Sequence, residues 1–120
     1  MRRACLLVVA TVGACGCTSE VQPPLASGDY VFAHRFEEHP DIPSTEFAVQ
    51  IRGRQVTIIN NGPTDIFPRG LIEQGTLMWH AKSGQWIIGT DAADANAADV
   101  GGCSDGPSII DLQRKTYWTC

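Results

Sequence analysis

The sequence predicts an all-β fold, a small antiparallel β-barrel or sandwich of six to eight strands built from hairpins. Two observations predict it. After residue 28, large apolar residues recur at every second position, and turn-forming residues separate these runs at short spacings. A length of 120 residues with 43% apolar content corresponds to one globular domain.

The first strand is expected over residues 30–36, where one inward face carries Tyr30, Phe32, His34 and Phe36. Pro40 and Pro43 then force the chain out of the sheet, because proline cannot donate a ladder hydrogen bond. A hairpin of residues 47–60 follows, and its two-residue turn, Gly53-Arg54, has glycine first. This turn fixes the expected pairs as Arg52 with Gln55, Ile51 with Val56, Val49 with Ile58, and Phe47 with Asn60.

A second hairpin is expected from residues 76–81 and 85–89, with Lys82-Ser83-Gly84 as the turn and Gly84 in the left-handed conformation. In that register His80 faces Trp86 and Trp79 faces Ile87. Both faces then carry large groups, which places the hairpin in the middle of the sheet or beside a cavity.

The remaining segments are less regular. In residues 64–75 a short strand is expected at Leu71-Ile72, and residues 109–112 are expected to pair with 115–118 around Gln113-Arg114. Residues 90–100 contain five alanines between a possible N-cap, Asp91, and a glycine stop, which indicates one short helix near 91–100. The same composition also fits a mobile loop.

The first residues have the pattern of an export signal. Met1-Arg2-Arg3 is basic, and the apolar stretch of residues 4–14 is too short to cross a bilayer, which needs about 20 residues. The stretch ends in Val12-Gly13-Ala14-Cys15, which resembles the lipobox of bacterial lipoproteins. The alternative is a plain secretory signal with an incidental cysteine.

The lipobox resemblance implies cleavage before Cys15 and lipid attachment to that residue, with several acyl chains giving stable membrane anchoring. No Asp follows Cys15, so the resemblance implies the outer membrane, facing the periplasm, as the location. The expected organisation is a signal peptide at 1–14, a lipidated N-terminus with a flexible tether at 15–27, and an antiparallel β domain at 28–120.

Three cysteines remain after lipid attachment at Cys15 and loss of the leader: Cys17, Cys103 and Cys120. In an oxidising periplasm we expect a disulfide between Cys103 and Cys120, which would hold the C-terminal residues. A pairing of Cys17 with either of them is the alternative. No Cys-x-x-Cys motif is present, so no thioredoxin-like redox site is suggested.

Several chemistries are disfavoured. Thirteen acidic against nine basic residues give a net charge of −4 without a basic stripe, so nucleic acid is not an expected partner. Zinc would require convergence of His34, His39 and His80, which their spacing does not favour, and no EF-hand pattern is present. No Gly-x-Ser-x-Gly elbow occurs, and Glu37 and Glu38 would point to opposite faces of a strand. We therefore expect no metal, no cofactor and no catalytic residues.

The candidate binding residues are aromatic or polar groups on or beside the tryptophan hairpin: Trp79, Trp86, Trp118, Arg69 and His80. Tryptophan is enriched at binding hot spots. The competing interpretation is that the tryptophans fill a small core. Similar architecture occurs in lipocalin-like proteins and in membrane-bound lysozyme inhibitors, but no motif of either group is present, so no residue roles transfer.

Three functions remain. The first is a non-catalytic, lipid-anchored periplasmic domain that binds a protein partner in the cell envelope, in an assembly, inhibitor or immunity role; a packed barrel interior would favour it. The second is a carrier of a small apolar ligand, which a cavity of several hundred Å³ beneath Trp79 and Trp86 would favour. The third is a hydrolase, which a buried histidine–carboxylate pair near a serine would favour.

Overall fold

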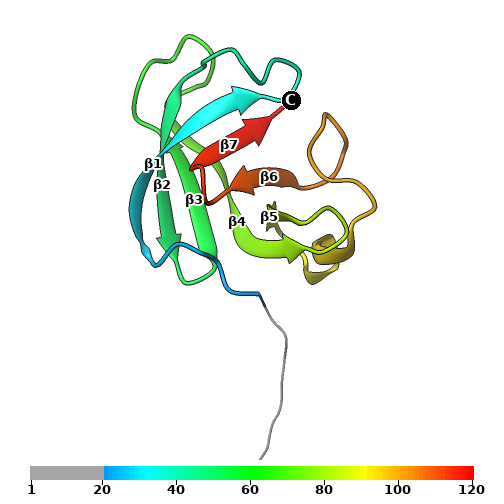
Figure 1. Cartoon of the computed structure of the whole chain (residues 1–120). Helices are drawn as coiled ribbons and strands as arrows, with labels where there is room; N and C mark the ends of the chain where they lie inside the picture. Colours follow the sequence, from blue (N-terminus) through cyan, green and yellow to red (C-terminus); the bar gives the residue numbers. More distant parts are fainter. Residues whose placement is uncertain (1–20) are drawn as a thin grey trace, which may run out of the picture.

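The computed structural model describes residues 21–120, so the predicted signal peptide, the lipid-attachment residue Cys15 and Cys17 lie outside the described residues. The described chain is all-β, as predicted: seven strands form one sheet that closes into a barrel (Figure 1). Its elements are β1 (Gly28–Phe36), β2 (Glu46–Arg52), β3 (Gln55–Asn60), β4 (Gly70–His80), β5 (Gln85–Gly89), η3 (Ala92–Asn96), β6 (Ser108–Asp111) and β7 (Thr116–Thr119).

The strands follow one another around the barrel in chain order. Sequential neighbours pair antiparallel, and the barrel closes where β7 pairs with β1 in parallel. Within residues 21–120, no helix combines the length and apolar character that crossing a bilayer requires.

The β2–β3 hairpin has the predicted register, from Arg52 opposite Gln55 to Val49 opposite Ile58. The ladder ends one pair later, at Ala48 and Ile59, so the expected pair of Phe47 with Asn60 is not part of it. Gly53 has φ of +63°, which confirms a turn with glycine first. The alternation places the apolar residues of both strands inside the barrel: Phe47, Val49, Ile51, Val56 and Ile58.

Strand β4 is longer than predicted, because it runs without a break over 11 residues from Gly70 to His80. The sequence predicts a short strand at Leu71-Ile72 and a separate one from Thr76. The register with β3 shifts between Ile58 and Ile59, which face Glu73 and Leu71. Such a bulge absorbs one extra residue, here Ile72, so a single strand continues through an irregular sequence.

The predicted register of the β4–β5 hairpin is wrong by one residue. Trp79 lies opposite Trp86, and His80 lies opposite Gln85. The carbonyl of His80 accepts hydrogen bonds from the backbone N–H groups of both Ser83 and Gly84, so the connection has four residues rather than three. Gly84 has φ of +68°, the left-handed conformation that the sequence predicts.

The predicted helix near 91–100 is a shorter element, the five-residue 3₁₀ helix η3. Asp91 is its N-cap as predicted, accepting from the N–H of Ala93, and Asp94 accepts in return from the N–H groups of Thr90 and Asp91. These backbone hydrogen bonds lower the pKa of Asp94. No residue of η3 is buried, so packing does not extend the helix toward residue 100.

The predicted disulfide between Cys103 and Cys120 is confirmed, with an S–S distance of 2.01 Å. It joins the end of β7 to the long connection between η3 and β6. The strands β6 and β7 also pair as predicted, with Ile110 opposite Tyr117 and Asp111 opposite Thr116.

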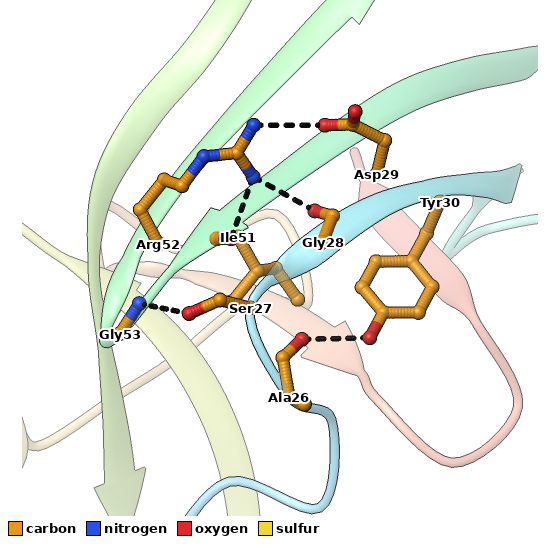
Figure 2. Close-up of polar contacts among 8 residues, drawn as sticks. All are labelled: Ala26, Ser27, Gly28, Asp29, Tyr30, Ile51, Arg52 and Gly53. Atoms are coloured by element: carbon orange, nitrogen blue, oxygen red, sulfur yellow. Dashed lines mark hydrogen bonds and ion pairs between the residues drawn. The ribbon is translucent and has the colours of Figure 1, made fainter.

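Residues 21–27 lie against the barrel before β1 begins. Ser27 Oγ accepts from the N–H of Gly53 at 2.8 Å, and the hydroxyl of Tyr30 donates to the carbonyl of Ala26 at 2.6 Å (Figure 2). The guanidinium of Arg54 donates to the carbonyl of Val21 at 2.6 Å, and Leu25 packs against the core. Contacts with the barrel therefore begin ahead of residue 28, where the sequence predicts that folding starts.

Candidate functional site: a tryptophan slot between two strands

The seam between β5 and β6 is short. These strands share two residue pairs, Ile87 with Ile109 and Ile88 with Ser108, as few as β6 and β7, whereas β4 and β5 share five. Beyond the two pairs, a hollow of about 240 Å³ opens. We call it the tryptophan slot, and it is lined by Trp79, Gly84, Gln85, Trp86, Ile109, Ile110, Asp111, Leu112, Gln113 and Trp118.

Three tryptophans from three strands line this slot. Trp79 and Trp86 are cross-strand partners, so their rings lie on the same face of the sheet, 5.5 Å apart and in an edge-on arrangement. Tyr117 points into the barrel and is buried, so its neighbour Trp118 points outward. The slot therefore has indole rings on both its inner and its outer side.

Arg54 contacts the ring of Trp86, one of the two inner tryptophans. Its guanidinium lies 5.9 Å from the ring centre of Trp86, within reach of a cation–π interaction. The same group donates to the carbonyls of Leu77 and Val21. Trp86 is 8% exposed and belongs to the buried core cluster, and Trp79 packs against that cluster. The competing interpretation, in which the tryptophans fill the core, therefore holds for Trp86.

Polar groups surround the opening. Gln85 lines it from the start of β5 and Gln113 from the β6–β7 turn, and Asp111 adds a carboxylate. One oxygen of Asp111 accepts from the N–H groups of Gln113 and Arg114, at 3.1 and 2.9 Å, and so shapes the β6–β7 turn. An adjoining hollow of about 390 Å³ shares Gln85, Ile109, Asp111 and Trp118 with the slot and extends to Glu37, Pro40 and Arg114.

The other two candidate binding residues do not line the slot. Arg69 is exposed in the β3–β4 loop and donates to the carbonyl of Asn61. His80 is 2% exposed; one ring nitrogen lies 2.7 Å from Ser83 Oγ and the other 2.7 Å from the carbonyl oxygen of Ala97. His80 thus connects the β4–β5 turn to the chain after η3.

The opposite end of the barrel is closed by an aromatic cluster around His34. Its two ring nitrogens lie 2.9 Å from Ser44 Oγ and 2.8 Å from Thr119 Oγ1, so one hydroxyl donates to the ring and the other accepts from it. The rings that surround the imidazole are Phe36, Phe47, Phe67 and Tyr117. Burial lowers the pKa of His34 from 6.5 to about 4, because the imidazolium would lose its hydration.

One acidic side chain reaches the barrel interior near this cluster. The hydroxyl of Tyr117 donates to a carboxylate oxygen of Glu73 at 2.5 Å. Burial raises the pKa of Tyr117, and the hydrogen bond to Glu73 raises it further, so the phenol stays protonated. The pair satisfies two polar groups across β4 and β7.

The described residues do not bring the three histidines together as metal ligands. The group of potential ligands that lies close together within residues 21–120 is Glu38, Cys103 and Cys120, all exposed, and the two sulfurs are bonded to each other. Nor does either buried histidine have a carboxylate partner there, although each contacts a serine. The arrangement that the hydrolase hypothesis requires is therefore not present in the described part of the chain.

The sequence identifies the three tryptophans but not the rest of the slot. The divergence of β5 and β6 exposes further lining residues: Gln85, Asp111, Leu112 and Gln113. The only signal for them in the sequence is that they lie in or near predicted turns. Comparisons with known proteins add no relative, since no family model, curated protein or solved structure matches the chain.

Proposed function

We propose that this chain is a non-catalytic binding module of the bacterial cell envelope, anchored to the outer membrane through Cys15, that binds a protein partner at the tryptophan slot. The observation that carries the proposal is the convergence of Trp79, Trp86 and Trp118 on one open hollow. Large aromatic side chains in a hollow with a polar rim are the usual centre of a protein interface.

The packed interior of the barrel favours a protein partner over a carried small molecule. The barrel interior is occupied by a continuous cluster of buried side chains, among them Phe32, Ile51, Ile58 and Leu77. A hollow barrel of the lipocalin kind therefore gains no support, whereas a slot open to the surface suits one inserted side chain.

The position of the slot is compatible with anchoring through residue 15. Antiparallel pairing places the β2–β3, β4–β5 and β6–β7 turns at one end of the barrel, and two of these turns border the slot. Residues 21–27 run along the same end, where Ser27 contacts Gly53 (Figure 2). A partner at the slot would therefore meet the barrel at the end that leads toward the lipid.

Site-specific photo-crosslinking in intact envelopes tests the proposal. Benzoyl-phenylalanine in place of Gln113, beside the slot, should give one discrete protein adduct, whereas the same group at Gln50, exposed on β2, should not. Adding Trp118→Ala should abolish the adduct. Equal adducts from both positions, or an adduct that survives Trp118→Ala, would reject the slot as the binding site.

The anchor is tested separately. Cys15→Ser should move the protein from the membrane fraction to a soluble periplasmic fraction, because the lipid would have no attachment point. Unchanged membrane partition would reject the lipid anchor and leave the slot proposal in place.

A further inference from the structure

The walls of the tryptophan slot are strand edges. Besides Trp79 and Trp118, consecutive strand residues line it, Gln85 and Trp86 of β5 and Ile109–Asp111 of β6, together with the adjoining turn residues Gly84, Leu112 and Gln113. In a paired sheet, successive side chains point to opposite faces, so a hollow on one face meets every second residue. Consecutive residues can line one hollow only where it reaches the strands edge-on.

The extent of the β5–β6 ladder also shows that the strand edges are open at the slot. If the β5–β6 ladder continued, Trp86 would face Ile110 and Gln85 would face Asp111, but it stops at Ile87 and Ile109. Both strands keep their other neighbours over the same residues, since Trp86 pairs with Trp79 and Ile110 pairs with Tyr117. Each strand is therefore held in extended form, with one edge that the sheet does not use.

We infer that the protein partner enters the slot as an extended peptide, which continues the sheet along the free edge of β6 and inserts a large apolar side chain between the tryptophans. This inference rests on the proposed function and names the form of the partner. Edges of this kind bind peptides by strand addition, where main-chain hydrogen bonds supply affinity and pockets for side chains supply specificity.

The side-chain pattern of the peptide follows from the two sides of the slot. In an added strand one side chain points inward, toward Trp79, Trp86 and Leu112, and the next points outward, toward Trp118. The inward position therefore selects a large apolar residue. The outward position lies beside the adjoining hollow, where Glu37, Asp111 and Arg114 provide charged partners.

A random heptapeptide library displayed on phage tests the inference. Peptides are selected on the disulfide-intact protein and counter-selected on Trp118→Ala. Selected peptides should share one large apolar position, and their affinity should fall at least tenfold on Trp118→Ala. Thermal unfolding of this variant confirms that it is folded.

N-methylation separates strand addition from simple anchoring. Methyl groups on the backbone nitrogens that face β6 should weaken a selected peptide at least tenfold, whereas methylation of nitrogens outside the segment bound in the slot should not. Equal affinity of both methylated forms would overturn strand addition. Failure to enrich any peptide over Trp118→Ala would also overturn it, as would saturable binding of tri-N-acetylchitotriose, a saccharide probe, at the slot in place of peptides.

These results remain distinct from a failure of the proposed function. A partner that crosslinks at Gln113 in a Trp118-dependent way, but whose isolated segments do not bind as strands, would keep the binding site and reject only its peptide form.

Discussion

The two ends of the barrel use similar aromatic side chains for opposite purposes. At the closed end, Phe47 and His34 are packed among other rings and are at most 1% exposed. At the slot end, Trp79, Trp86 and Trp118 border an open hollow. The slot is open because β5 and β6 separate after two residue pairs, Ile87 with Ile109 and Ile88 with Ser108.

The face of the sheet and the end of the ladder together decide what an aromatic residue does in this fold. Inward rings such as Phe47 and Trp86 belong to the core cluster, whereas Trp118 points outward from the β1–β7 ladder. Where the β5–β6 ladder stops, Trp79 and Trp86 also border the slot. The two ends should respond differently to loss of a ring, and the following predictions test that difference.

The largest effect is expected from Phe47→Ala at the closed end. Removal of this buried ring leaves a cavity among His34, Phe67 and Tyr117, which should lower the free energy of unfolding by about 3–5 kcal/mol. Urea unfolding monitored by circular dichroism measures it. A loss below about 1 kcal/mol would show that this end is not packed as described.

Removing the disulfide should have the next largest effect. Replacing Cys103 and Cys120 by serine should lower the free energy of unfolding by about 3 kcal/mol, since the bond closes a loop with a sequence separation of 17 residues. Urea unfolding measures this loss, and crosslinking at Gln113 serves as a control that should be unchanged. Loss of crosslinking in the folded variant would contradict the claim that the slot forms independently of the disulfide.

The closed end should also respond to pH. The pKa of His34 is lowered from 6.5 to about 4, so the unfolded chain binds a proton more readily than the folded one. This contribution is fully present above pH 6.5 and is lost as pH falls toward 4, by at most about 3 kcal/mol. In His34→Gln the loss of stability between pH 7 and pH 4.5 should be smaller than in the natural chain. Equal pH dependence in both proteins would refute the assignment to His34.

The smallest effect on stability is expected from Trp118→Ala at the slot end, by about 1 kcal/mol or less, because this residue is only partly buried. Partner affinity should nevertheless fall at least about tenfold. The contrast with Phe47→Ala is the direct test of the comparison. A stability loss as large as that of Phe47→Ala would mean that Trp118 is a core residue.

The sequence predicts most of the strands and the registers of the β2–β3 and β6–β7 hairpins, and in the β2–β3 hairpin alternation and turn chemistry agree. At Gly53 the two-residue turn and the apolar pattern select the same pairing of β2 with β3. In the β4–β5 hairpin both possible registers place large groups on both faces, so alternation does not choose between them. In the structure, the N–H of Gly84 donates to the carbonyl of His80, and this hydrogen bond accompanies the observed register.

The slot itself was beyond prediction from the sequence. The slot exists because the β5–β6 ladder ends early. Residues 90–107, which connect these strands, have no periodicity that would indicate where the ladder ends. The one-residue shift of the β4–β5 register also matters, because it places Trp79 opposite Trp86 rather than opposite Ile87. Three tryptophans were identifiable as candidates, but their meeting point was not.

The most direct test of the central claim is an NMR titration of the ¹⁵N-labelled protein with the partner identified by crosslinking. The account predicts that the indole N–H signals of Trp79, Trp86 and Trp118 shift together and saturate, with the backbone amides of Gln85 and Asp111, while Arg69 is unaffected. Saturable shifts confined to the outer faces of β1–β3, with all three indole signals unchanged, would contradict it.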